Sequence, residues 1–343
     1  MAKSLGMVAL LAMTLGMAVA PPPLESKAPR CILSWGKKGD KPGEFYSPIG
    51  IAINAKDEVF VTDVNNARVQ RFSSEGKHLG GFDLPRDEPK RKSCQAGGIA
   101  LEKGHVYLTF MQQHKVVVYT EEGKLVRQWG KRGKGDGEFD QPGGIVLGRD
   151  GNVYVADQCN HRVQKFTKEG KFLGKWGQYG EKPGQFGAPE RAGSRFAGPH
   201  FLAQDNKGYL FTTEGVSGRV QKFTPEGKPH SSWGNKSDDP GGFGSTKMGY
   251  SPYSFGPITV AVDAHDRVWV SSLNDRVQAF TSDGKFLFGI SGSGKKKGQL
   301  ARPHGMAFDS QGHLYIADAG NQRIQKFEIP APRATNKARE QAP

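Results

Sequence analysis

Two histidines occupy one shared position of a repeated sequence pattern and are the strongest candidates for chemistry. His200 lies in the segment GPHFLA and His304 in the segment RPHGMA. Isoleucine or glycine stands at this position in the other four copies, at Ile49, Gly97, Gly143 and Ile258. Imidazole is a common ligand for divalent metals, so the pair could bind a small anionic ligand or one divalent metal, zinc or calcium. The alternative is that both rings only hydrogen-bond to water and backbone.

Positively charged residues form a second group. The chain carries a formal net charge of +14, and six loops hold 19 Lys and Arg against 12 Asp and Glu. These loops are residues 36–47, 83–95, 130–141, 177–198, 234–256 and 291–302. We expect them to share one face and to bind a protein, a polysaccharide or another anionic ligand, with nucleic acid as a less favoured partner. The alternative is that this charge only keeps the protein soluble.

The candidate ligand-binding residues of these loops fall into two sets. One set is a run of three lysines in the last loop. The other lies in the two loops that carry insertions, which are the first choice for specificity because binding residues concentrate on loops. The two sets together are Arg195, Tyr250, Tyr253, Lys295, Lys296 and Lys297.

A repeated unit must position these residues. A run close to RVQKF recurs at 68–72, 115–119, 162–166, 219–223, 276–280 and 323–327. The copies follow one another at 47 residues, with ten extra residues in the third and fourth intervals. Each copy contains four short segments rich in β-branched residues and separated by turn residues, and none has a helical apolar period. Four antiparallel strands in each of six copies predict an all-β, six-bladed β-propeller.

The two ends of the repeat array predict how the ring closes. The last copy lacks a fourth strand, whereas residues 31–36 resemble a fourth strand without the preceding three. We expect this N-terminal strand to complete the last blade and to leave no unpaired edge at the junction. The propeller is therefore predicted over residues 30–330, as a monomer, with a disordered tail at 331–343.

The first twenty residues are predicted to be a secretory signal peptide. Lys3 precedes an apolar run that is too short to span a bilayer and ends in small residues. Nothing later in the chain is apolar enough to cross a membrane. We therefore expect a secreted, periplasmic or cell-envelope protein.

Composition narrows the classes further. The 47 glycines and 21 prolines argue against a helical bundle, and three cysteines exclude a disulfide-dense scaffold. Cys94 and Cys159 are predicted on the same face, where a disulfide is one alternative in an oxidising compartment.

An acidic residue precedes an arginine by five positions in four of the copies. The pairs are Asp63 with Arg68, Asp157 with Arg162, Glu214 with Arg219 and Asp318 with Arg323. The carboxylate can accept hydrogen bonds from the guanidinium and from loop amides. Because the arrangement recurs, we interpret it as a structural brace.

The segment VYVAD followed by N-x-R-V-Q-K-F resembles the NHL repeat, most clearly at 157–162 and 318–323. The resemblance covers residues 30–330 and implies a six-bladed propeller that binds protein or RNA. The family also includes a metal-dependent enzyme, the peptidyl-hydroxyglycine amidating lyase. Its metal-binding histidines lie on alternate blades, as His200 and His304 would, so the resemblance implies a metal site at these two residues.

We therefore expect an exported NHL-type propeller that binds a partner or an anionic ligand on its basic loop face. The alternative is a metal-dependent lyase or hydrolase with its site at His200 and His304, at the mouth of the central channel. A third interpretation is a purely structural scaffold of the cell envelope. The sequence leaves enzymatic activity open.

Overall fold

The computed structural model describes residues 28–86, 94, 96–187, 198–244, 256–290 and 292–331. In these ranges the chain is almost entirely strands and turns, and its helices are single 3-10 turns at Val64–Asn66 (η1), Gln158–Asn160 (η2) and Ala319–Asn321 (η5). None of them could cross a bilayer. The predicted signal peptide and nearly all of the predicted tail lie outside the described residues, as do Arg195, Tyr250 and Tyr253.

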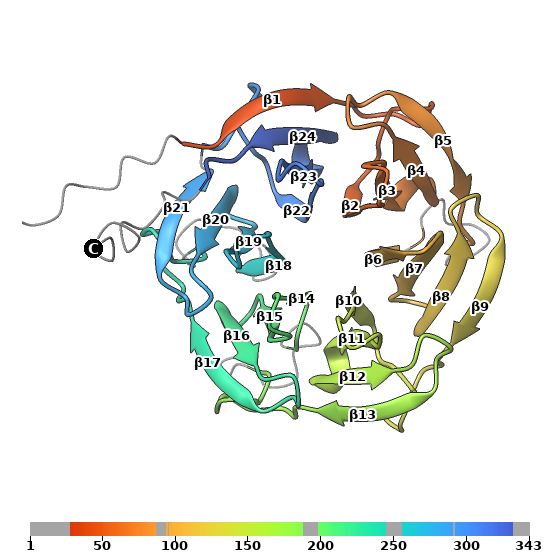
Figure 1. Ribbon diagram of the computed structural model, residues 1–343, viewed down its shortest axis with the longest axis vertical. Helices are drawn as coiled ribbons and strands as arrows, with labels where there is room; N and C mark the ends of the chain where they lie inside the picture. Colours follow the sequence, from red (N-terminus) through yellow and green to blue (C-terminus); the bar gives the residue numbers. More distant parts are fainter. Residues whose placement is uncertain are drawn as a thin grey trace, which may run out of the picture.

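Six four-stranded antiparallel sheets form a ring around a central channel (Figure 1). Blades 1 and 2 are β2 (Pro48–Ile53), β3 (Val59–Asp63), β4 (Arg68–Phe72), β5 (His78–Asp83), β6 (Ala96–Glu102), β7 (His105–Phe110), β8 (Lys115–Thr120) and β9 (Leu125–Trp129). Blades 3 and 4 are β10 (Pro142–Leu147), β11 (Val153–Asp157), β12 (Arg162–Phe166), β13 (Phe172–Trp176), β14 (Leu202–Gln204), β15 (Leu210–Glu214), β16 (Arg219–Phe223) and β17 (Pro229–Trp233). Blades 5 and 6 are β18 (Pro257–Val262), β19 (Val268–Ser272), β20 (Arg276–Phe280), β21 (Phe286–Ile290), β22 (Pro303–Phe308), β23 (Leu314–Asp318), β24 (Arg323–Glu328) and β1 (Arg30–Trp35). The predicted fold is confirmed.

Strand β1 closes the ring as expected. It pairs antiparallel with β24, with Cys31 opposite Phe327 and Trp35 opposite Ile324. The two strands lie side by side at the outer rim (Figure 1). The N-terminal strand thereby provides the fourth strand that the last repeat lacks.

Hydrophobic contacts between neighbouring blades form the core. In blades such as the first, the second strand is completely buried. All five residues of its sequence VFVTD are inaccessible. Each Glu-Gly-Lys or Asp-Gly-Lys turn also contacts the preceding blade through its glycine. A Cβ on Gly170, for example, would lie 2.7 Å from the indole of Trp129. The positive φ and this close approach explain why the turn requires glycine.

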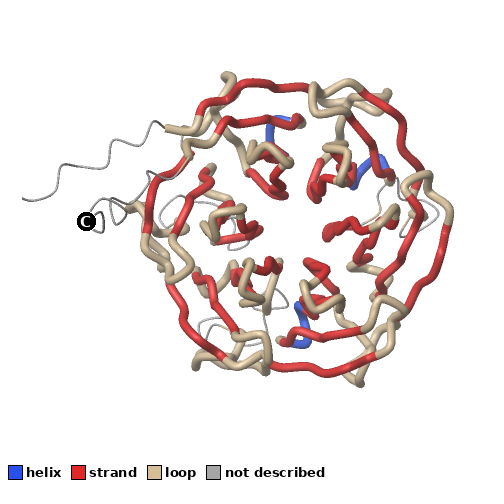
Figure 2. The backbone as a smooth tube through the Cα atoms, in the orientation of Figure 1, coloured by secondary structure: helices blue, strands red, loops and turns tan. Residues whose placement is uncertain are grey.

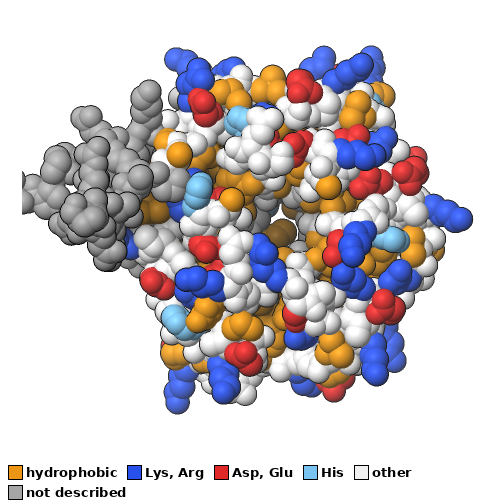
Figure 3. Space-filling model, viewed as in Figure 1, with side chains coloured by type: hydrophobic (Ala, Val, Ile, Leu, Met, Phe, Trp, Pro, Cys, Tyr) orange, Lys and Arg blue, Asp and Glu red, His pale blue; other side chains and the backbone are white. Residues whose placement is uncertain are grey.

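The chain runs back and forth between two faces of the ring. One face carries two kinds of loop: those that lead from each outer strand to the next blade, and those that join the second and third strands. We call this face the loop face. The other hairpin turns form the turn face. The tube drawing shows the inner strands converging on the channel (Figure 2). In the space-filling view the ring is hollowed at its centre, and basic side chains with interspersed acidic ones lie around the visible rim (Figure 3).

Candidate ligand site on the loop face

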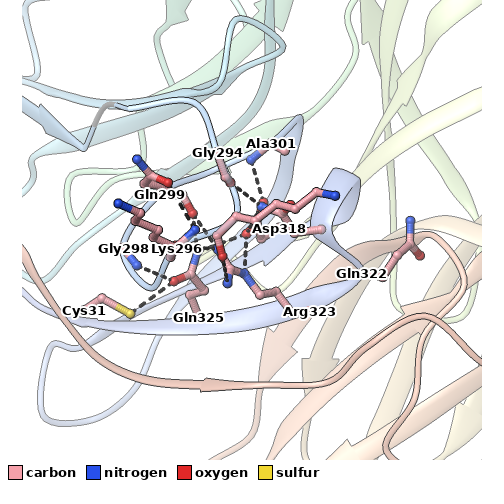
Figure 4. Close-up of polar contacts among 12 residues, drawn as sticks. Cys31, Gly294, Lys296, Gly298, Gln299, Ala301, Asp318, Gln322, Arg323 and Gln325 are labelled. Atoms are coloured by element: carbon pink, nitrogen blue, oxygen red, sulfur yellow. Dashed lines mark hydrogen bonds and ion pairs between the residues drawn. The ribbon is translucent and has the colours of Figure 1, made fainter.

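A buried carboxylate organises each loop-face loop in the most regular blades. In blade 6, Asp318 Oδ2 accepts hydrogen bonds from Asn321 Nδ2 at 2.9 Å, Arg323 Nε at 2.7 Å and Gln325 Nε2 at 3.0 Å. Its Oδ1 accepts from the Ala301 amide at 2.7 Å. These side chains converge beneath the loop that leads into the blade (Figure 4).

The arginine of this brace fixes the main chain of the loop. Arg323 donates to the carbonyls of Lys295, Lys296 and Gln299 at 2.8–2.9 Å. The same arrangement recurs in blades 1 and 3, and blade 4 has glutamate in place of aspartate. The recurring pairs are therefore structural, as the sequence indicated.

The innermost strand of each blade is irregular at the position shared by the two histidines. In blades 1, 2, 3, 5 and 6 its register with the second strand shifts between the first and fourth residues, as in a β-bulge. A bulge redirects the side chain at that point. His304 lies within such a bulge, and His200 stands just before β14, with its amide donating to the Thr213 carbonyl at 2.8 Å.

A cavity of about 350 Å³ opens at the loop-face mouth of the channel. The channel-facing residues of all six blades contribute to it, and both candidate histidines are among them. Hydroxyl and amide groups from the loops add polar contacts. The lining is Ser47, Ile49, Val64, Asn65, Gly97, Met111, Gly143, Gln158, His200, Phe201, Ile258 and His304.

The two channel-facing glycines differ in what lies next to them. A Cβ on Gly97 would lie 3.7 Å from Met111 Sδ, the first residue after the second strand of its blade. A Cβ on Gly143 would lie 2.3 Å from the main-chain carbonyl of His200 and 3.7 Å from Gln158 Oε1. The main chain of blade 4 therefore leaves no room for a side chain at Gly143.

The two histidine blades differ from these two. The residue after the second strand is small there, Gly215 or Ala319. A Cβ on Gly215 would lie only 2.7 Å from Cε1 of His200. The small residue thus leaves room for the imidazole. The sequence analysis did not identify this pairing of small residue and histidine. An alignment of these loop positions would have shown it.

His304 is a neutral hydrogen-bonding group at physiological pH. Burial, with smaller effects from the charges of Arg302 and His200, lowers the pKa of its imidazole to about 4. Its Nδ1 is buried, and among the described residues it has no hydrogen-bond partner. An unpartnered polar atom beside a cavity is a feature that a bound ligand can stabilise.

The residues at the mouth do not fit a resident metal ion. Calcium takes six to eight oxygen ligands, mostly carboxylates and carbonyls, and none of the cavity-lining residues is acidic. A catalytic zinc site usually has three protein ligands, and the lining supplies two imidazoles. In the described part of the chain, no group of three or more His, Cys, Asp or Glu could hold a metal. We derive no chemical step through a metal.

The last basic loop lacks an ion pair that two equivalent loops contain. In the loops of blades 1 and 3, Lys37 pairs with Glu44 at 3.4 Å and Lys131 pairs with Glu138 at 3.2 Å. Gly292 and Gln299 occupy the two equivalent places in the loop at 292–302. Gln299 Oε1 still accepts from the Lys296 amide at 3.1 Å, so the turn is kept without the ion pair.

The three lysines of this loop are exposed. Lys297 Nζ donates to the Ile32 carbonyl of β1 at 2.8 Å, whereas Lys295 and Lys296 are held through their main chain by Arg323. The loop ends at Arg302, two residues before His304. The basic run and His304 are therefore linked along the chain, while Lys297 itself contacts the outer strand of the blade.

The cysteine alternative is corrected. All three cysteines are described, and none of them forms a disulfide, so Cys94 and Cys159 are not linked. Cys94 is instead buried in the hydrophobic core between blades 1 and 2.

Comparison with known proteins identifies the repeats. The family model described as NHL repeat matches residues 45–72, 139–166 and 300–327. Protein brain tumor of Drosophila melanogaster is 27% identical over 120 residues, which are 34% of this chain and 12% of that protein. The match thus spans about an eighth of the relative's length.

Solved structures share the fold at low sequence identity. A virginiamycin B lyase from Staphylococcus aureus is 18% identical with a TM-score of 0.53, covering 82% of this chain and 95% of that chain. A gluconolactonase from Xanthomonas campestris is 16% identical with a TM-score of 0.58, covering 83% and 87%. The PQQ-bound aldose sugar dehydrogenase from Streptomyces coelicolor is 18% identical with a TM-score of 0.55, covering 88% and 98%. At these identities the likeness establishes the fold alone.

The matched repeats coincide with the structure. They fall in blades 1, 3 and 6, which are the three blades with a complete Asp–Asn–Arg–Gln brace. The other blades keep the strand pattern and vary the brace. The chain is therefore a six-bladed β-propeller that carries NHL repeats in blades 1, 3 and 6.

Proposed function

We propose that the protein is an exported binding module that takes an anionic ligand on its loop face. The loop at 292–302 carries the proposal, because it holds Lys295, Lys296 and Lys297 and contains no acidic residue. Lys295 and Lys296 are exposed, on a main chain that is fixed by three hydrogen bonds from Arg323. A fixed cationic loop loses little conformational entropy when it binds an anion.

The channel mouth supplies the second part of the proposed site. His200 and His304 line the cavity at the channel mouth, together with the amides of Asn65 and Gln158. These groups can hydrogen-bond a small part of the ligand while the lysines attract its charge. The ligand would be an acidic polysaccharide or an acidic protein segment.

A chemical step in the same cavity is the second candidate. Its support is the unpartnered Nδ1 of the neutral His304 and the enzymes among the structures of similar fold. The cavity lining offers imidazole, amide and hydroxyl groups, which suffice for binding. We therefore propose binding as the function, with a lyase or hydrolase activity as the alternative.

Salt-dependent binding to a defined polyanion tests the proposal. Poly-L-glutamate should bind the protein, and its affinity should fall with added salt because the attraction is between exposed charges. Lys295→Gln/Lys296→Gln should weaken binding by about tenfold and make the salt dependence shallower. The matched control is Lys124→Gln/Lys171→Gln, which removes two exposed lysines from the turn face. Equal affinities for the two double variants would overturn the proposal.

A further inference from the structure

Blade 5 lacks the carboxylate that organises the loops in four other blades. Asp63, Asp157 and Asp318 end the second strand in blades 1, 3 and 6, and blade 4 has Glu214 there. In blade 5 the equivalent residue is Ser272, which is fully buried. Its hydroxyl donates to Asn274 Oδ1.

The hydrogen-bond donors that surround this carboxylate elsewhere are nevertheless kept in blade 5. Asn274, Arg276 and Gln278 correspond to the asparagine, arginine and glutamine of the complete brace. Asn274 Nδ2 is buried and has no hydrogen-bond partner among the residues that the structure describes. In blades 1, 3 and 6, this amide donates to the carboxylate at 2.8–2.9 Å.

The arginine and the glutamine have also lost their shared acceptor. Arg276 Nη1 donates to the main-chain carbonyl of Asp238 at 2.6 Å. In the described part of the chain, its Nε has no carboxylate of the kind that the equivalent arginines contact in blades 1, 3, 4 and 6. Within the same residues, Gln278 Nε2 bonds only to the Gly242 carbonyl, at 2.8 Å. Three donors thus surround a place from which one acceptor has been removed.

Blade 2 lacks the brace in a different way. There the acid is replaced by Phe110, the arginine by Lys115 and the glutamine by Val117. Phe110 and Val117 are buried in the core, so the acceptor and one of its donors have been exchanged together for apolar contacts, while Lys115 donates to Gln128 instead. Replacing both partners costs little, whereas removing one leaves buried polar groups unsatisfied. Only blade 5 has lost the acceptor alone.

Nearby acidic residues do not fill the gap. Asp275 Oδ1 accepts from the Arg302 amide at 2.7 Å, which ties it to the neighbouring blade. Residues 245–255 contain no Asp or Glu. A cavity of about 180 Å³ lies beside Arg276 and Gln278 toward the outer strand β21, with Asp238, Phe286 and Ile290 also in its lining. Among the described residues, no carboxylate takes the place of the missing acceptor.

We propose that blade 5 binds a carboxylate group at this position, between Asn274 Nδ2, Arg276 Nε and Gln278 Nε2. The chemistry is that of the aspartate in the complete brace, supplied in trans. The source is either a small free carboxylate ion or an acidic side chain of a bound polymer. The proposal stands apart from the proposed function, because a small ion can bind here whether or not the lysine loop is used.

Thermal unfolding in the presence of formate tests the small-ion source. A ligand that binds only the folded state raises its melting temperature. Formate should produce a saturable rise of a few degrees in the wild type at constant ionic strength. Arg276→Gln should abolish the rise. The matched control is Lys115→Gln, which removes the cation at the same place in blade 2 and should keep it.

Restoring the acceptor within the chain provides an independent check. Ser272→Asp should raise the melting temperature without formate and remove the response to formate. If this variant does not fold, the comparison of Arg276→Gln with Lys115→Gln decides. A rise with poly-L-glutamate alone that is lost in Arg276→Gln would assign the site to a polymer side chain. An absent response to both probes, or an equal response in all variants, would overturn the proposal.

Discussion

His304 couples the stability of the fold to pH. Burial lowers the pKa of its imidazole to about 4, whereas an unfolded histidine titrates near 6.5. Between these pH values the unfolded chain binds the proton more readily than the folded one. The contribution of His304 to the free energy of unfolding is therefore fully present above pH 6.5 and is lost as the pH falls toward 4. The loss from this one group should reach about 3 kcal/mol, from roughly 1.4 kcal/mol per pKa unit.

A substitution isolates this contribution. His304→Ile introduces the residue that two other blades carry at this position, Ile49 and Ile258. The free energy of unfolding of the variant, measured with denaturant, should fall less steeply than that of the wild type between pH 6.5 and 4. His230→Gln, which removes an exposed imidazole on β17, serves as the control. Parallel pH profiles for His304→Ile and the wild type would show that the imidazole is not excluded from solvent in the way described.

Closure by β1 can be tested at the scale of the element. Removing residues 28–35 deletes the strand and should lower the melting temperature by many degrees, because β24 then has an unpaired edge. The exposed pair Arg30–Glu328 at 2.8 Å lies at the end of the same strand. Arg30→Ala should change the melting temperature very little, since exposed ion pairs contribute about 0–1 kcal/mol. An unchanged melting curve for the deletion would contradict ring closure.

The elements were predictable from the sequence because the repeat fixes them six times. The RVQKF run, the turn glycines and the orphan N-terminal strand define strand order and closure without any knowledge of contacts. The loops were only partly predictable. That Gln299 keeps the turn of Glu44 while removing its charge becomes clear only when the hydrogen bond from the Lys296 amide is seen.

The candidate site was predicted only in part, for a physical reason. The equivalence of His200 and His304 follows from the alignment of the repeats. The space around each ring depends on contacts across the blade, such as that between His200 and Gly215, which no spacing rule gives. Similarly, the buried donors of blade 5 become unusual only when their acceptor is found to be missing.

At the scale of the whole molecule, the two faces of the propeller differ in construction. The turn face consists of short hairpins whose repeated Glu-Gly-Lys sequences alternate acid and base. On the loop face, the braced loops surround the channel mouth, and the last of them carries Lys295, Lys296 and Lys297 without an acidic residue in the loop. We therefore expect the loop face to bind the anionic ligand and the turn face not to bind it, so lysines on the turn face provide the control in a binding experiment.

Lysine modification footprinting with a bound polyanion tests the central claim most directly. An amine-reactive acetylating reagent labels every exposed lysine, and mass spectrometry compares each site with and without poly-L-glutamate. The proposed function predicts strong protection of Lys295 and Lys296 on the loop face and unchanged labelling of Lys124 and Lys171 on the turn face. Equal protection on both faces, or protection of the turn face alone, would contradict it.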